Sequence, residues 1–113
     1  MLAQGQSTSA ATTTYNTIFT VGSGKSVIIN KIDIFNAGGS NYDIGIRIVP
    51  SGATAGATHA YTLPGTGSTY GRVDSLKTLI VTGPITLSAG DFIQLSSSVA
   101  SVINYFIFGV EIS

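Results

Sequence analysis

Residues with catalytic potential are few in this chain and lie far apart. The only histidine, His59, falls in a stretch of Gly, Ala and Thr residues, where no rigid element is predicted. A nucleophilic triad needs a histidine that is held in place by an acid. The five acids do not cluster in sequence: Asp33, Asp43, Asp74, Asp91 and Glu111. Asp33 and Asp43 are more simply explained as partners of Lys31 or Arg47 on neighbouring strands, and Asp91 as the residue that closes a turn. We therefore expect no catalytic residues and no enzymatic activity.

Metal and nucleotide chemistry are equally poorly supported. The chain has no cysteine, no paired histidines and no loop rich in Asp, so we expect neither a metal site nor a cofactor. The string Gly24-Lys25-Ser26 resembles part of a phosphate-binding loop, but Phe19 stands where that motif needs its first glycine. The residues that follow are β-branched and predict a strand, whereas the motif needs a helix.

The elements that would position any functional side chain are strands. Residues 26–36 and 42–50 are two long apolar stretches separated by five small or polar residues, and we expect them to form a β-hairpin. In the second stretch Tyr42, Ile44, Ile46 and Ile48 share one face, with the period of two that a half-buried strand requires. Such an apolar hairpin needs a second sheet to cover it.

The first of these stretches is apolar on both faces. Strict alternation puts Ile28, Ile32 and Ile34 on one face. The other face then carries Val27, Ile29, Lys31, Asp33 and Phe35. A strand that is apolar on both faces is usually covered on both. We therefore predict that Val27, Ile29 and Phe35 contact a loop of this chain or another subunit.

The rest of the chain predicts further short strands and no helix. Strand patterns cover residues 15–21, 60–63, 76–81, 85–87, 92–96 and 103–112, with turns at Gly83-Pro84 and at residues 88–91. In the last strand Phe106, Phe108, Val110 and Ile112 are expected to face the core. We predict an all-β fold, an antiparallel β-sandwich of seven or eight strands that is jelly-roll-like, with one domain over residues 15–113.

Two segments outside this framework are candidates for contacts. Residues 1–14 are small, polar and without periodicity, so we expect a flexible, extended N-terminal arm. It either frays or adds to a neighbouring sheet edge through residues such as Gln4, Gln6, Thr12 and Thr14. Residues 51–72 form a long Gly-rich connection that is either a mobile surface loop or a recognition loop. Its candidate interface residues are Tyr61, Tyr70 and Arg72.

The charge content bears on partners. Charged residues make up 9% of the 113 residues, against about 25% in an ordinary soluble domain. The net charge is zero. Such a surface is poorly defended against association, which favours packing against copies of the same chain or a partner. The alternative is a monomer kept soluble by Ser, Thr, Asn and Gly. No basic cluster predicts nucleic-acid binding, no apolar run is long enough for a membrane helix, and we expect no signal peptide.

Carbohydrate binding is a further alternative, because sandwich domains commonly bind sugars through exposed aromatic residues. The chain has no Trp, and its five tyrosines do not fall on one evident strip of the predicted strands.

Several stretches together resemble small virion structural proteins of tailed bacteriophages. They are a strand ending in Thr20-Val21, a turn at Gly24-Lys25, an Ile/Val-rich strand ending in Asn36, and a strand closing on Pro50-Ser51-Gly52. Residues 85–93 (Ile-Thr-Leu-Ser-Ala-Gly-Asp-Phe-Ile) and 109–113 (Gly-Val-Glu-Ile-Ser) continue the resemblance, which covers roughly residues 15–113.

This resemblance implies a capsid decoration, or cement, protein that binds at capsomer junctions and stabilises the phage head. The expected partners are the major capsid protein and copies of the chain itself, as a homotrimer or homodimer. The expected location is the virion, after synthesis in the host cytoplasm. A small tail, neck or fibre component is the alternative within the same class of protein.

Overall fold

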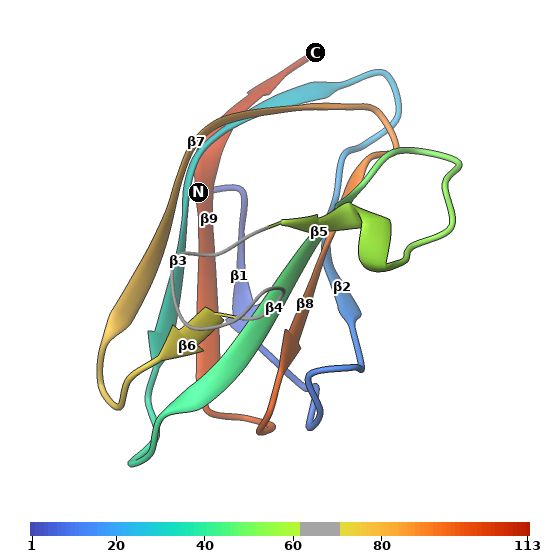
Figure 1. Ribbon diagram of the computed structural model, residues 1–113. Helices are drawn as coiled ribbons and strands as arrows, with labels where there is room; N and C mark the ends of the chain where they lie inside the picture. The colour runs from blue at the N-terminus through green and yellow to red at the C-terminus, as the bar shows by residue number, and fades with distance from the viewer. Residues whose placement is uncertain (62–70) are drawn as a thin grey trace.

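A computed structural model describes residues 1–61 and 71–113, and this part of the chain consists mainly of β-strands (Figure 1). The strands are β1 (Ala3–Gln6), β2 (Asn16–Thr20), β3 (Ser26–Asn36), β4 (Tyr42–Val49), β5 (Ala60–Tyr61), β6 (Gly71–Val73), β7 (Thr78–Ser88), β8 (Phe92–Ser97) and β9 (Ile103–Ile112). A single 3₁₀ turn, η1 (Ala57–His59), is the only helical element among the described residues. The predicted all-β class is confirmed.

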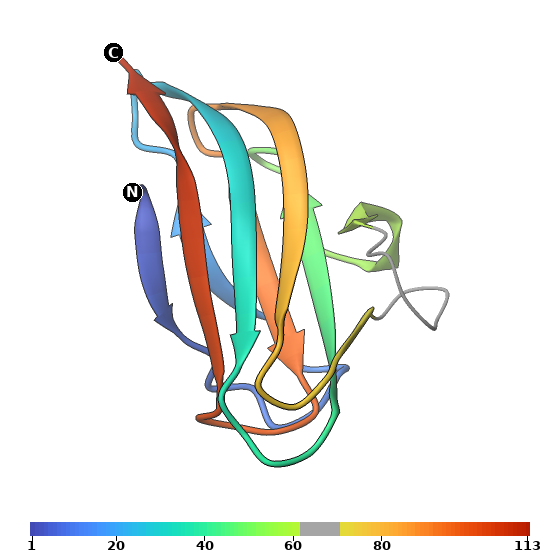
Figure 2. The ribbon, with the colours of Figure 1, turned by 90° about the vertical axis from the view of Figure 1, so that its left-hand side faces the viewer.

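The strands form two antiparallel sheets that lie face to face (Figures 1 and 2). Sheet A has the order β1-β9-β3-β7, and sheet B has the order β2-β8-β4-β5, with β6 also paired to β4. Most consecutive strands lie in opposite sheets, whereas β4, β5 and β6 lie in the same one. Almost all strand pairing therefore joins segments that are far apart in sequence.

The expected hairpin of residues 26–36 and 42–50 is wrong. Strand β3 pairs with β7 and β9 in sheet A, whereas β4 pairs with β5, β6 and β8 in sheet B. The connection crosses between the sheets because the Asn36 side chain, which is fully buried, holds it there. Its amide donates to the carbonyl oxygens of Ser40 (2.7 Å) and Val73 (3.0 Å), and its Oδ1 accepts from Gly38 N (2.8 Å).

The core lies between the two sheets and is built from aliphatic side chains. Ile44 and Ile46 of β4 are fully buried, and Tyr42 and Ile48 pack against them, as their shared face predicts. Sheet A contributes the buried residues Val27, Ile29, Ile32, Ile34, Val81, Leu87, Ile103 and Ile107. The close-packed β-branched side chains explain why strands, rather than helices, form here.

A bulge in β3 decides which of its side chains face the core. The register to both neighbours shifts between Ile29 and Lys31, which leaves Asn30 as the extra residue. Glycines flank the bulge on both sides: a Cβ at Gly83 of β7 would overlap the carbonyl oxygen of Ile29, and one at Gly109 of β9 would overlap that of Ile28. The bulge therefore fits only where both neighbouring strands carry glycine.

The predicted turn at Gly83-Pro84 is also wrong, because β7 runs through both residues as one strand. Strand β7 lies at the edge of sheet A, where a proline leaves no ladder hydrogen bond unmade. The predicted turn after it is confirmed: Gly90 has a φ of 86°, and Asp91 Oδ2 accepts from Ser88 N (2.8 Å).

The N-terminal segment is part of the fold, which corrects the expectation of a flexible arm. Strand β1 pairs with β9, and Leu2 N donates to the carbonyl oxygen of Ile107 (2.7 Å). Ser7 and Ser9 are almost fully buried, and Ser97 Oγ donates to the carbonyl oxygen of Ser9 (3.0 Å). Hydroxyl and backbone hydrogen bonds hold the segment in place. Because such bonds need no alternating apolar residues, the sequence shows no periodicity here.

Candidate functional site

The most distinctive surface is the outer face of sheet A, which Figure 2 presents to the viewer. It is largely apolar for a surface, since three of the exposed large aliphatic side chains lie on it: Ile80 (48% exposed), Val110 (54%) and Ile112 (47%). We call it the A face. Its central members are Ile28, Lys31, Asp33, Phe35, Ile80, Phe106, Phe108, Val110 and Ile112.

The strand register arranges these side chains in rows across the sheet. Phe106 of β9 lies beside Asp33 of β3, and Asp33 lies beside Ile80 of β7. In the next row Phe108 lies beside Lys31. Phe35, Phe106 and Phe108 are partly exposed, so three aromatic rings remain within reach of solvent on one sheet. Exposed apolar patches of soluble proteins are often found where they contact other molecules, which makes this face the candidate site.

Two charges lie in the middle of the A face. Lys31 Nζ lies 3.4 Å from Asp33 Oδ2 and 5.0 Å from the centre of the Phe108 ring. The other carboxylate oxygen, Asp33 Oδ1, is buried and has no hydrogen-bond partner in the described structure. A buried carboxylate oxygen without a partner is unfavourable, so this ion pair is incompletely satisfied within the chain.

Three of the predicted interface residues belong to this face. Gln4 pairs in register with Phe106, and Gln6 pairs with Asn104, which in turn pairs with Phe35. Gln6 Nε2 donates to Asn104 Oδ1 (3.1 Å) at the exposed edge. Gln4, Gln6 and Phe35 are therefore brought together by strands β1, β9 and β3, although they are distant in sequence.

Val27 and Ile29 do not belong to the A face, which corrects their assignment as interface residues. Both are fully buried between the sheets, where no partner can reach them. Strict alternation placed them with Lys31 and Phe35, but the bulge at Asn30 reverses the alternation within β3. One residue added to a strand moves every later side chain to the other face.

The remaining predicted interface residues lie elsewhere. Thr12 and Thr14 lie between β1 and β2, and Tyr61 in β5 packs against the core. Arg72 in β6 forms an exposed ion pair with Asp74 (3.2 Å). Tyr70 lies outside the described residues. The structure does not bring these residues to the A face.

Sequence reasoning missed the aromatic residues of β9. Phe106, Phe108, Val110 and Ile112 were expected in the core, but Ile103 and Ile107 are the fully buried residues of this strand, and Tyr105 packs beside them. Both faces of the strand are apolar, so alternation alone could not choose between them. The signal that could have helped is Gly109, since a Cβ there would overlap the β3 backbone next to the bulge.

The outer face of sheet B has a different character. The Arg47 guanidinium lies 3.8 Å from the centre of the Tyr15 ring and covers that side of it, and the Tyr15 hydroxyl lies over Gly45. Nearby polar atoms without a hydrogen-bond partner are Arg47 Nε, Gln94 Oε1 and Ser96 Oγ, all of them buried. Arg47 therefore occupies one face of the Tyr15 ring, which leaves that face closed to a stacking sugar.

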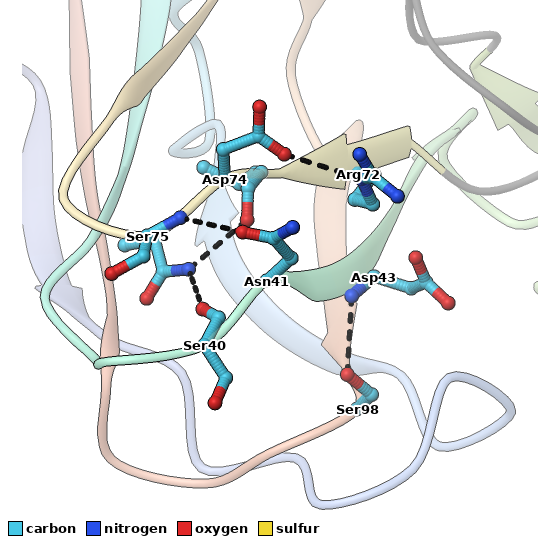
Figure 3. Close-up of polar contacts among 9 residues, drawn as sticks. Ser40, Asn41, Asp43, Arg72, Asp74, Ser75 and Ser98 are labelled. Carbon is cyan, nitrogen blue, oxygen red and sulfur yellow. Dashed lines mark hydrogen bonds and ion pairs between the residues drawn. The ribbon is translucent and has the colours of Figure 1, made fainter.

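A polar cluster fixes one end of the molecule, where three connections meet (Figure 3). Asn41 Oδ1 accepts from Ser75 N (2.9 Å), and Ser98 Oγ accepts from Asp43 N (3.1 Å). Ser75 Oγ donates to the carbonyl oxygen of Gly38 (2.7 Å). These bonds tie backbone to side chain in turns, so the cluster holds the ends of the strands together.

The described residues hold no group of three or more His, Cys, Asp or Glu side chains suited to a metal ion, and no pocket opens among them. His59 Nδ1 accepts from Gly56 N (3.3 Å) within its own turn. No helix in the described part of the chain is long and apolar enough to cross a membrane. Comparison with family models, with curated proteins and with solved structures finds no match to this chain.

Proposed function

We propose that this chain is a non-enzymatic structural protein of a phage particle, and specifically a capsid decoration protein. In this role it binds at capsomer junctions and stabilises the head. The observation that carries the proposal is the A face, where three phenylalanines and several aliphatic side chains lie on one open sheet. A domain with 9% charged residues and such a face is suited to a permanent assembly.

The order of the strands supports a jelly roll, which is the finer fold that we propose. In sheet A the first strand, β1, lies beside the last, β9, and the order continues with β3 and β7. In sheet B the second strand, β2, lies beside the second last, β8, and the order continues with β4 and β5. Two layers that are wrapped together by such connections are typical of jelly rolls, a fold used by viral capsid and lectin domains. Fold alone does not specify function, so this likeness adds only to the surface argument.

The mechanism is adhesive. Each copy buries apolar side chains against its neighbours, and many copies act together on a symmetric shell. Bound copies stabilise the assembled state over the dissociated state by mass action, so the shell fails at a higher temperature. The proposed partners are the major capsid protein and copies of this chain, and the proposed location is the virion.

The proposal is tested on particles of the virus that encodes the chain. Mass spectrometry and image reconstruction of purified heads should find the chain at a fixed copy number on the outer shell. Heads that lack it should rupture at a lower temperature, and added protein should restore the difference. Absence from purified particles would overturn the proposal. Finding the chain only in the tail, neck or fibres would replace decoration with that alternative.

A separate glycan-binding assay distinguishes the carbohydrate-binding alternative. A decoration protein should show no saturable binding to glycans, because Arg47 already covers the Tyr15 ring. Saturable binding that disappears with Tyr15→Ala, but not with Phe106→Gln, would favour a sugar site on the outer face of sheet B.

A further inference from the structure

We infer that the A face binds the A face of a second copy of this chain, about a two-fold axis that passes between Lys31 and Asp33. The axis lies midway between the A faces of the two copies, parallel to both faces and perpendicular to their strands. The strands of the two copies are therefore roughly antiparallel. The inference rests on the proposed function, which assigns the A face to assembly. It names a second copy of the chain as the molecule that this face contacts.

The rows of the A face match each other under this operation. The axis exchanges the row of Phe106, Asp33 and Ile80 with the row of Phe108, Lys31 and Thr82. Phe106 of one copy therefore meets Phe108 of the other, while Ile80 meets Thr82. One row further out, Phe35 meets Ile28. A two-fold interface requires this reciprocity, because residue i must suit residue j in both directions.

The two charges favour the same axis. Lys31 and Asp33 are the only charged side chains in the central rows, and they are opposite in sign. The two-fold places Lys31 of each copy over Asp33 of the other, so both contacts are attractive. The Asp33 side chain is 20% exposed, so part of the carboxylate can still be reached by Lys31 of the second copy. This complementarity sets the register of the pair.

A second copy fits this charge pattern better than a partner of one sign. A uniformly acidic or basic surface would repel either Asp33 or Lys31, and a purely apolar surface would leave both charges buried without a new partner. Another A face supplies the two opposite charges at the required spacing. The phenylalanines around them then meet aromatic and aliphatic side chains.

The size of the A face is sufficient for a specific dimer. Strand β3 has 11 residues. At a rise of about 3.3 Å per residue and a strand spacing of about 4.8 Å, four strands span roughly 500–700 Å² on each copy. Two such faces bury roughly 1,000–1,400 Å², which is at the low end of the range for specific protein interfaces. Two sheets packed in this way lie about 10 Å apart, within reach of Lys and Asp side chains.

The first test is the mass of the full chain by light scattering, from micromolar to millimolar concentration. We expect a dimer. Lys31→Glu and Asp33→Lys should each weaken it by about tenfold or more, because each places like charges across the axis twice. Circular dichroism and thermal melting should show that both variants remain folded.

The second test mixes these two variants. The Lys31→Glu chain carries two acids on the A face and the Asp33→Lys chain carries two lysines, so every contact across the axis becomes attractive in a mixed pair. We expect the mixture to form a heterodimer of near wild-type affinity, and the Lys31→Glu/Asp33→Lys double variant to dimerise again. Recovery in the mixture cannot arise from changes within a single chain.

The apolar part of the interface is tested with a matched pair of variants. Phe106→Gln removes an aromatic ring that meets Phe108 of the second copy, and should weaken the dimer by about tenfold or more. Leu76→Gln removes a side chain of 65% exposure that lies outside the A face, and should leave the dimer unchanged.

Several results would overturn the inference. They are a monomer at millimolar concentration, a trimer, a dimer that tolerates Lys31→Glu, and variants that stay monomeric when mixed. The proposed function is read separately, by sedimentation of the protein with phage heads. Binding of a monomeric wild-type chain to heads would keep the function and reject the dimer. If the chain forms a dimer of the expected register but is absent from purified particles, the dimer is kept and the proposed function is rejected.

Discussion

Gly109 of β9 lies opposite Ile29 of β3 at the point where β3 gains its extra residue. A Cβ at position 109 would overlap the carbonyl oxygen of Ile28 and crowd the Cα of Ile29, next to the bulge. This relationship determines the composition of the A face, because the bulge turns Ile29 inward and turns Lys31, Asp33 and Phe35 outward. The glycine and the bulge thus place the charged centre and one aromatic ring of the A face.

Gly109→Ala should destabilise the domain by roughly 2–4 kcal/mol, because the added Cβ requires a shift of the β3 backbone. Chemical denaturation of the purified variant measures the loss. Gly39→Ala is the matched control, since a Cβ there meets no atom within 4 Å, and its stability should stay within about 0.5 kcal/mol of wild type. Equal stabilities for the two variants would show that the bulge is not packed against Gly109.

The sequence predicts individual strands well, whereas it does not predict which strands pair. The predicted stretch 26–36 coincides with β3, and 103–112 coincides with β9. Periodicity reports the two faces of a strand, and says nothing about its neighbours in the sheet. Short connections suggested a hairpin, but the buried side chain of Asn36 directs the chain into the other sheet. The Asn36 side chain binds the backbone of residues 40 and 73. Residue 73 is distant in sequence, so the pattern around Asn36 does not predict this contact.

The candidate site was predicted only in part, for a similar reason. Gln4 and Gln6, expected in an N-terminal arm, and Phe35, expected on a strand face, share the A face. Phe106 and Phe108 were placed in the core instead, because an apolar residue on a doubly apolar strand fits either face. One unrecognised bulge residue, Asn30, was enough to reverse the assignment of Val27 and Ile29.

Ile46→Asp should unfold the domain, because it buries a charge without a partner at a position of 0% exposure. The expected loss exceeds about 4 kcal/mol, close to the whole stability of a small domain. Ile80→Asp makes the same chemical change at a position of 48% exposure and should leave a cooperatively melting protein. The two are compared by thermal melting. A soluble, cooperatively folded Ile46→Asp protein would show that the faces of β4 are assigned wrongly.

Asp91→Ala should cost about 1–3 kcal/mol, because this carboxylate closes two connections at once. Oδ1 accepts from Ser51 N (2.8 Å) and Oδ2 accepts from Ser88 N (2.8 Å). Asp74→Ala removes a carboxylate whose partner is the exposed Arg72, and should cost less than about 1 kcal/mol. Denaturant midpoints order the two variants. The reverse order would mean that the turn at residues 88–91 forms without Asp91.

Ser9→Ala should loosen the N-terminal segment and lower stability by about 1–3 kcal/mol. The buried Ser9 Oγ lies 2.6 Å from the carbonyl oxygen of Thr14 and 2.8 Å from that of Ala11, so its single hydrogen can be donated to either. It also accepts from Ser97 N (3.3 Å). Thr13→Ala changes an exposed hydroxyl of the same segment and should have little effect. Denaturation measures the loss.

Hydrogen exchange locates the effect of the same variant. In Ser9→Ala, amides of β1 should exchange faster than in wild type, while those of β4 should keep their protection against local opening. Because β1 carries Gln4 and Gln6 to the edge of the A face, the loosened segment should also weaken self-association. Unchanged exchange in β1 would show that the apolar contacts of Leu2 and Ala3, rather than the buried serines, hold the segment in the sheet.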